Sequence, residues 1–294
     1  MRVLHYRSDI RSIVFVLLAL VVPAAQWAAW HRDAALYGVG YALTFLACII
    51  NHNHQHCPTF VPLPLNRLFG VLLSLAMGFP ASGVVAMHNH NHHVHNNHAE
   101  DFVRVSLVNF RWNLLNLLLL PFVALRRYAS VKSRELAAWR TTRPDLYRQL
   151  CLERWTLYPM MIVLGVARPL ETLVYLILPW LFGQWGILAI NLIQHDGCDP
   201  DSEYNHSRNF VGRWINWCTF NNGYHTAHHL RPGLHWSLLP QLHEQIREQM
   251  DPALERRSLG AALIEFYVWP GRRPVLSCTS TLAGVERAQG GEAF

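Results

Sequence analysis

Charged residues are scarce in this sequence. They account for 15% of its 294 residues, against about 25% in soluble globular proteins, and apolar residues reach 51%. The basic residues form no stripe beside aromatic residues, and no nucleic-acid-binding motif is present. The composition therefore predicts an integral membrane protein with no nucleic-acid partner. The net charge of +6 fits basic loops that face an anionic cytoplasmic leaflet.

Redox motifs are missing as well. The six cysteines form no CxxC pair and no disulfide framework, so we expect reduced thiols. The sequence contains no haem-binding module and no flavin fingerprint. An oxidation carried out by this chain would therefore need electrons from an external donor.

Long apolar runs are present, and they predict an all-α membrane fold. Residues 12–30 and 34–50 each approach the roughly 20 residues that span a bilayer, and they read as a transmembrane hairpin. The alternative is a secretory signal peptide, because three arginines precede the apolar run 13–22. The hairpin explains more of the sequence, since the second apolar run follows almost at once.

The later apolar segments predict a mixture of crossing and interfacial helices. Residues 65–87 contain glycine and proline and are expected to dip into the membrane and return, or to lie in the interface. The basic stretch 126–154 places that loop in the cytosol, so 107–125 is expected along the interface. Residues 156–194 would hold two crossings with a break near Arg168-Pro169. The total is about four transmembrane helices.

One membrane domain is predicted over the whole chain, residues 1–294. Its parts are the transmembrane hairpin 12–50, the first two histidine clusters in 51–100, the second transmembrane pair 156–194, a cytosolic helical cap 195–270 that carries the last histidine cluster, and a weakly ordered tail 275–294. In the cap, Leu242, Ile246 and Met250 recur at helical spacing and indicate amphipathic helices.

The first histidine cluster follows the hairpin. His52 and His56 are four residues apart, so on a helix their rings share one face and form a chelating pair. Such pairs also occur by chance in histidine-rich loops, so this cluster alone is only moderately specific.

The second cluster runs from His88 to His98. On an α-helix His88 and His92 share a face, and His93 is offset by about 100°. A trio of this kind can offer ligands to two metal ions. The alternative is a low-complexity tract that binds metals loosely.

Two further elements lie far along the chain. Asn191 and His195 are four residues apart at the end of an apolar run, where a lone histidine is more often structural than a ligand. His225, His228 and His229 have the spacing i, i+3, i+4, which gathers three imidazoles on one helical turn. Four separated elements together indicate a metal site more strongly than any one of them does.

Several polar residues near the clusters are expected to have supporting or solvent-exposed positions rather than to bind metal. Acidic residues that can accept the second ring N–H of a ligand, but are individually expected to be solvated, are Glu100, Asp101, Asp196, Asp199, Asp201 and Glu203. Histidines expected at the surface or an interface include His5, His206 and His243. Histidines expected in outer or solvent positions beside the clusters are His54, His90, His95, His98 and His235.

The clusters resemble the histidine boxes of the membrane fatty-acid desaturase and hydroxylase superfamily. That family shows HxxxH, then HxxHH or HxxxHH, then HxxHH, and residues 52–56, 88–93 and 225–229 fit these patterns in order. Residues 191–197 resemble an additional ligand segment in which a histidine binds iron and an asparagine reaches it through water. The resemblance covers roughly residues 45–245.

The resemblance implies a di-iron centre with nine histidine ligands. They are His52, His56, His88, His92, His93, His195, His225, His228 and His229. Asn191 would contact the metal through water. The second cluster has more histidines than the pattern needs, so His90 or His95 can take the place of His88.

The resemblance also implies the reaction. It predicts a membrane-bound oxidoreductase that uses two iron ions and O2 on an unactivated C–H bond of a fatty acyl or other lipid-like substrate. The histidine boxes would face the cytosol at the inner or cytoplasmic membrane, and the electron donor would be of the ferredoxin, rubredoxin or cytochrome type. Desaturation is favoured, and hydroxylation of an alkane or lipid is the alternative because both begin by abstracting hydrogen. The stretch 126–154 is a candidate dock for an acidic donor or a segment lying on anionic lipid.

Two interpretations from other classes remain open. A histidine-rich membrane metal-binding or transport protein would make few demands on His195 or His225, and its spans would carry charged residues, which are nearly absent here. A zinc hydrolase needs three ligands and an open position, and it leaves most of the histidines unexplained. Imidazole ligands alone do not choose among iron, zinc, copper and nickel.

Overall fold

The computed structural model describes residues 2–29 and 33–269, and these ranges are mostly helical. The tail 275–294, predicted to be weakly ordered, lies outside them. The five cysteines within the described ranges carry no disulfide bond. The α-helices are α1 (Asp9–Ala29), α2 (Ala34–His56), α3 (Leu63–Met77), α4 (Val84–Met87), α5 (His93–His95), α6 (Asn113–Thr142), α7 (Pro144–Ala167), α8 (Pro169–Thr172), α9 (Leu178–His195), α10 (Arg213–Cys218), α11 (His225–Leu230), α12 (Leu239–Ile246) and α13 (Leu259–Leu263).

Short 3-10 and π-helical turns connect these helices. The 3-10 turns are η1 (Ala81–Gly83), η3 (Val105–Leu107), η5 (Trp236–Leu238), η6 (Arg247–Gln249) and η7 (Pro252–Leu254). The π-helical turns are η2 (His88–His92), η4 (Leu173–Ile177) and η8 (Ile264–Val268). Within the described ranges, the strands β1 (Asn209–Phe210) and β2 (Glu255–Arg256) form one parallel pair.

The chain forms two compact units that interleave in sequence. The first unit comprises Met1–His90 and Tyr128–Ile187, and the second comprises Asn91–Arg127 and Leu188–Phe294. The boundaries fall inside η2, α6 and α9, so these elements run from one unit into the other. The second histidine cluster is therefore divided between the units.

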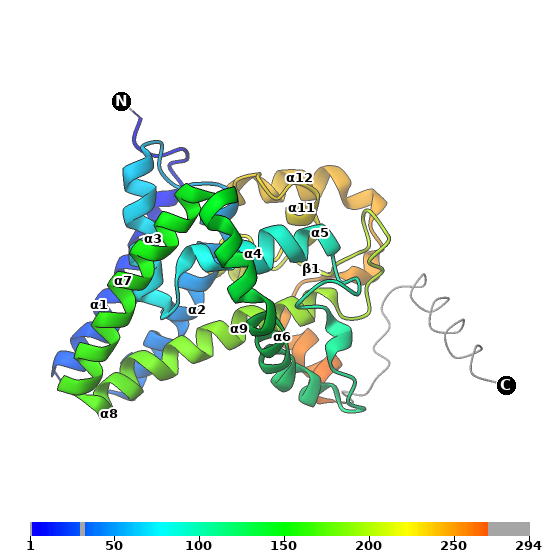
Figure 1. The fold of residues 1–294 in the computed structure, drawn as a ribbon. Helices are drawn as coiled ribbons and strands as arrows, with labels where there is room; N and C mark the ends of the chain where they lie inside the picture. The colour runs from blue at the N-terminus through cyan, green and yellow to red at the C-terminus, as the bar shows by residue number, and fades with distance from the viewer. Residues whose placement is uncertain (1, 30–32, 270–294) are drawn as a thin grey trace. The chain divides into compact units, whose positions relative to one another are not determined.

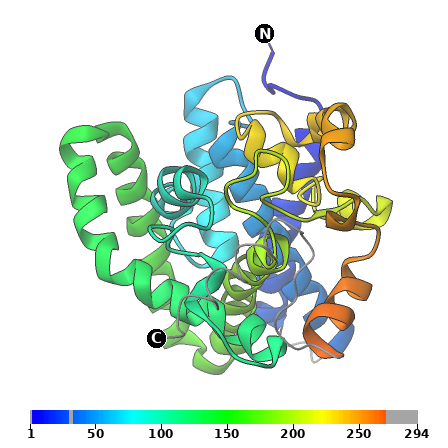
Figure 2. The same cartoon turned by 90° about the vertical axis from the view of Figure 1, so that its right-hand side faces the viewer.

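The first unit is a helix bundle. In it α1 packs against α2 and α3, and α3 packs against α7 (Figures 1 and 2). Leu157, Leu176 and Trp180 are buried at its core, with Trp27 and Leu75 packed against them. Helices α1 and α2 occupy the residues of the predicted hairpin 12–50, and α7 ends at Ala167, next to the predicted break near Arg168-Pro169.

A sharp bend separates α3 from the second histidine cluster. Helix α3 and the helical segment Ala81–His95 meet at 87°, as suits the predicted segment that dips into the membrane and returns. Gly78 ends α3 with a φ of 73°, and a Cβ atom there would lie 2.3 Å from the Trp180 ring. Glycine is therefore required at this bend, because any side chain would clash as well as strain the backbone.

Five helices are long and apolar enough to cross a membrane, so the chain is an integral membrane protein. They are Asp9–Ala28, Ala34–His56, Asn113–Thr142, Pro144–Ala167 and Pro169–His195. The sequence predicted about four, and the additional candidate is α6. There the apolar run and the basic residues after it form one continuous helix rather than an interfacial segment followed by a loop.

The second unit carries the remaining short helices around the β1–β2 pair. Helices α11 and α12 pack against each other, and both views show them side by side in yellow and orange (Figures 1 and 2). Leu242, Ile246 and Met250 are all buried, which confirms the amphipathic helix predicted from their spacing. This packing holds α11, and with it the last histidine box, against α12.

Candidate metal centre

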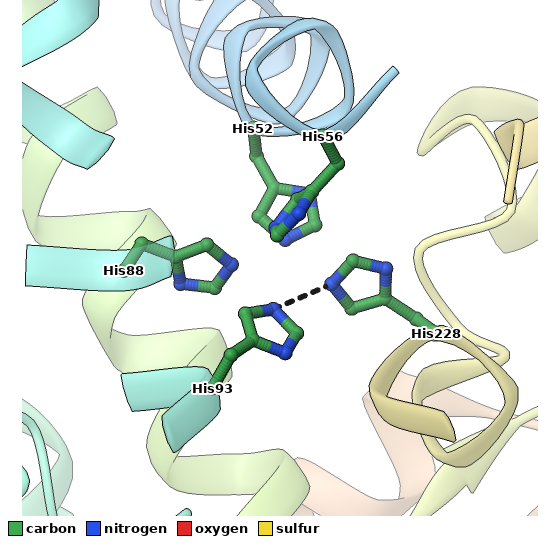
Figure 3. Close-up of side chains that lie close together, drawn as sticks. All are labelled: His52, His56, His88, His93 and His228. Carbon is green, nitrogen blue, oxygen red and sulfur yellow. Dashed lines mark hydrogen bonds between the residues drawn. The ribbon is translucent and has the colours of Figure 1, made fainter. Parts of the chain in front are cut away.

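Three predicted ligands gather in the first unit. His52 and His56 lie on the last two turns of α2, and His88 begins the η2 turn. The ring centroids are 4.5 Å apart for His52 and His88, and 5.0 Å apart for His56 and each of the other two (Figure 3). One ring nitrogen of each residue lies within 4.8 Å of the other two, so the three can share an ion.

Four predicted ligands form a group in the second unit. They come from the second box (His92), the end of α9 (His195) and α11 (His225 and His229), and their ligand atoms all lie within 4.8 Å of one another. His92, His195 and His225 are buried. His195 Nε2 lies 2.9 Å from His225 Nε2. Two ligands bound about 2.1 Å from one ion at a right angle would be about 3 Å apart, so this spacing suits a shared ion.

The last two predicted ligands meet each other in the second unit. His93 Nε2 and His228 Nε2 are 3.0 Å apart and joined by a hydrogen bond, drawn as the dashed line in Figure 3. The ring of His93 also lies 4.4 Å from that of His229, centroid to centroid. Each of the nine predicted histidines therefore lies beside at least one other of the nine.

A buried carboxylate orients His92. The Nδ1 atom of His92 donates to Asp101 Oδ2 across 2.8 Å, and Asp101 also accepts from the backbone N–H groups of Asn97 and Val103. Burial opposes ionisation of Asp101, but His92 and these hydrogen bonds outweigh it and lower the pKa of Asp101 to about 2. The prediction of a solvated acid is wrong for Asp101, because the loop that carries it folds back onto the second box.

A backbone carbonyl orients His195. Its Nδ1 atom donates to the carbonyl oxygen of His206 across 3.0 Å, which leaves Nε2 as the ring nitrogen that could bind a metal ion. The surface position predicted for His206 is wrong: its side chain is buried, and its ring lies 5.2 Å from that of His229. Burial lowers the pKa of His206 to about 4, and the neighbouring His92 acts in the same direction. His243, also predicted near the surface, is buried against Glu255.

The second box does not have α-helical spacing. Because η2 is a π-helical turn, His88 and His92 do not pair as they would on one face of an α-helix. His88 lies with His52 and His56, whereas His92 lies with His195, so the prediction that they share a face is wrong. The box contributes histidines to both groups, and its ligation of two metal ions stays a prediction.

His90 and His95 are the alternatives to His88 as the ligand from this box. His90 packs its ring against Trp139, with centroids 6.2 Å apart, and belongs to neither histidine group. His95 and His98 are also outside both groups, and His98 is exposed with its Nε2 3.6 Å from Asp201. The geometry therefore favours His88 among the candidates.

Comparison with known proteins gives one clear match. The family model described as fatty acid desaturase matches residues 25–259, well over half of the sequence. The chain belongs to the fatty acid desaturase family. No curated protein matches the sequence. The matched range includes all nine histidines.

Asn191 is the one predicted site residue outside the histidine groups. It lies one turn before His195 on α9, and its Nδ2 atom donates to the carbonyl oxygen of Val103 across 3.3 Å. In this desaturase-family chain the water-mediated contact of Asn191 with metal stays a prediction.

The chemistry of the donor set fits a metal ion. All the ligand atoms are imidazole nitrogens, which suit iron, zinc, copper and nickel. The Nε2 atom of His229 is buried and has no hydrogen-bond partner among the described residues, which is costly for a polar atom unless something binds it. Burial and the neighbouring histidines lower the pKa of His229 well below its usual value, so its ring is neutral and can donate a lone pair. The desaturase family is typically di-iron.

Proposed function

We propose that this protein is an O2-dependent di-iron desaturase that removes two hydrogens from an unactivated position of a fatty acyl or other lipid-like chain. The observation that carries the proposal is the buried four-histidine group of the second unit, in a membrane protein of the fatty acid desaturase family. A methylene group has no acidic proton, so acid–base side chains alone cannot open its C–H bond. A metal centre is therefore the part of the chain suited to this reaction.

We propose that the nine histidines hold two iron ions, and that the four-histidine group holds one of them. When bound, the ions supply the O2 chemistry that removes hydrogen. The protein's own contribution is orientation: Asp101 and the carbonyl of His206 keep protons on Nδ1 of His92 and His195. Those contacts direct the Nε2 lone pairs toward an ion and keep the neutral tautomer in place.

The membrane supplies the substrate, and a soluble protein would supply the electrons. Acyl chains are at home among the apolar helices of the first unit, whose outward faces expose large residues such as Val163 and Val166. We propose an external electron donor of the ferredoxin, rubredoxin or cytochrome type, because the sequence carries no second redox module. The iron-ligating boxes would face the cytosol, as would the basic residues at the end of α6 and the start of α7.

Sidedness is tested by cysteine accessibility in intact cells. Cys218 is already exposed on α10, and Ser133→Cys and Val94→Cys place thiols at two other exposed positions. In a background with the other cysteines replaced, an impermeant maleimide should label these thiols only after the membrane is opened. Labelling of any of them from outside intact cells contradicts a cytosolic site.

The reaction is tested by product mass. Purified protein loaded with iron is incubated with a chemical reductant, O2 and membrane lipids, and the His229→Ala variant serves as the inactive control. A lipid product lighter by two hydrogens is the expected result. A product heavier by one oxygen identifies a hydroxylase, and bound iron with no lipid oxidation contradicts the proposed activity.

A further inference from the structure

A buried strap links the two helices that carry most of the four-histidine group. We define the strap as residues 206–209, whose side chains are 5%, 0%, 0% and 1% exposed. All four residues, His206, Ser207, Arg208 and Asn209, are polar. Buried polar groups are costly unless they are hydrogen-bonded. Four consecutive buried polar residues therefore indicate that specific hydrogen bonds hold this segment.

One side of the strap completes the end of α9. The last four carbonyls of a helix lack partners within the helix. Here Arg208 supplies two donors that meet this need: its guanidinium donates to the carbonyl of Ile193 across 2.5 Å, and its backbone N–H donates to that of Gln194 across 2.6 Å. The guanidinium also donates to the carbonyl of Asp196 across 2.9 Å. His195 lies between these bonded carbonyls, and its own Nδ1 donates to the strap at His206.

The other side of the strap fastens the start of α11. The hydroxyl of Thr226 lies 2.9 Å from that of Ser207 and accepts from Asn209 Nδ2 across 2.8 Å. The backbone N–H of Thr226 donates to Asn209 Oδ1 across 3.0 Å. Thr226 is the residue between His225 and the rest of the last box. The strap thus fixes the end of α9 relative to the turn that carries His225 and His229.

Arg208 is the residue suited to this position. Its positive charge meets the negative end of the α9 dipole, and its planar fork reaches two carbonyls at once. The guanidinium also lies over the ring of Phe266, with its carbon 4.6 Å from the ring centroid. A second arginine, Arg256, lies over the same ring at 5.0 Å but pairs with Glu265 at 3.5 Å and is partly exposed. The two arginines share an aromatic neighbour, and the α9 carbonyls distinguish them.

We propose that Arg208 is a positioning residue of the four-histidine group: acting through the strap, it sets the placement of His195 relative to His225 and His229. The inference rests on the proposed function only in taking this group to be a metal site, and it holds for any imidazole-binding metal. Outer partners of metal ligands typically change metal affinity by about 10- to 100-fold, so a comparable effect is expected from Arg208.

The test uses cobalt(II), whose visible absorption reports the geometry of its ligands. The full-length protein in detergent is stripped of metal and titrated with cobalt(II), and its thermal unfolding is followed in parallel. The variants are Arg208→Met, Arg208→Lys and Thr226→Val, with Arg256→Met as the matched control. We expect Arg208→Met to lower cobalt affinity about tenfold or more and to shift the absorption bands.

The other variants are expected to change cobalt affinity by smaller amounts. Lysine keeps the charge but cannot bridge two carbonyls, so Arg208→Lys should lie between Arg208→Met and the parent. Thr226→Val removes the hydroxyl at the other side of the strap and should shift the bands in the same direction with a smaller loss of affinity. Arg256→Met should bind cobalt like the parent.

The outcomes separate positioning from general stability. If Arg208→Met unfolds at a lower temperature but keeps the parent affinity and spectrum, Arg208 is only structural and the proposal is overturned. If Arg208→Met does not fold, parent-like binding by both Arg208→Lys and Thr226→Val overturns it equally. A parent protein that binds no cobalt contradicts the metal site and this inference together. Cobalt binding without lipid oxidation in the iron form contradicts the proposed function alone.

Discussion

The histidines of the two units differ in what holds their rings. In the first unit, His52 Nδ1 lies 3.1 Å from Asn53 Oδ1, and His56 Nδ1 lies 3.3 Å from Asn89 Nδ2. These partners are neutral amides from within the boxes themselves. In the second unit, His92 is held by the carboxylate of Asp101 at 2.8 Å, and His195 by a backbone carbonyl in the buried strap.

This difference has an energetic consequence. Hydrogen bonds to ionised groups are shorter and stronger than those between neutral groups, and burial strengthens them further. The contact between Asp101 and His92 is of this kind, so it is expected to hold its ring more firmly than the amide of Asn53 holds that of His52. The contact of Asp101 should therefore matter more for metal binding than that of Asn53.

The largest expected effect comes from removing a ligand of the four-histidine group. In His229→Ala, the bound iron should fall from two ions per chain toward one, and turnover should drop by more than the roughly 100-fold that outer partners can cause. Among the described residues the buried Nε2 atom of His229 has no hydrogen-bond partner, as suits an atom that binds an ion, and alanine offers no ligand atom in its place. Elemental analysis and lipid product formation measure both quantities.

The matched control for that change is another histidine from the same boxes. His98 is exposed and belongs to neither group, so His98→Ala should keep two iron ions and normal turnover. Equal iron loss in the two variants would mean that the grouped histidines are not the ligands.

The next effect compares the outer partners directly. Asp101→Asn keeps the shape of the side chain but removes its charge, and it should weaken metal binding about 10- to 100-fold. Asn53→Ala removes the neutral contact to His52 and should cost clearly less. Metal titrations of the two variants under one set of conditions compare their losses of metal affinity. A larger loss in Asn53→Ala would reverse the comparison between the units.

The smallest effect concerns acid sensitivity of the metal-free protein. The pKa of Asp101 is lowered from its ordinary 3.8 to about 2 in the folded state. The unfolded chain therefore binds this proton more readily, so Asp101 stabilises the fold above about pH 4 and loses that contribution as the pH falls toward 2. The contribution is on the order of 2 kcal/mol.

Unfolding in detergent, followed from pH 7 to pH 2.5, measures this contribution. The difference in unfolding free energy between the parent and Asp101→Asn should stay constant down to about pH 5 and shrink below about pH 4. A difference that vanishes between pH 7 and pH 5 would assign the contact to titration of a histidine instead of Asp101.

Local patterns in the sequence predicted much of this structure. The apolar runs predicted α1, α2 and the break at Arg168-Pro169 because span length and proline are local properties. The nine histidines were named from the resemblance of the boxes to the family pattern, and the structure brings each of them beside another of the nine. The spacing within the second box could not be predicted, since nothing in the alternation of histidine and asparagine distinguishes a π-helical turn from an α-helix.

The contacts that Asp101 and Arg208 make around the candidate ligands could not be predicted from the sequence for a different reason. Asp101 reaches His92 across nine residues through a folded loop, and Arg208 reaches the end of α9 from a segment with no periodicity of its own. An acid in a polar loop is usually solvated, and an arginine is usually exposed. Residue type alone therefore predicted exposed side chains at both positions. Only tertiary structure reveals that these two charges are buried beside the candidate metal ligands.

Metal stoichiometry of the purified protein tests the central claim most directly. Protein expressed in iron-replete medium is purified without chelators, and its metals are quantified against chain concentration. The account predicts two iron ions per chain, falling toward one in His229→Ala and unchanged in His98→Ala. One zinc ion per chain with no iron would contradict the di-iron centre.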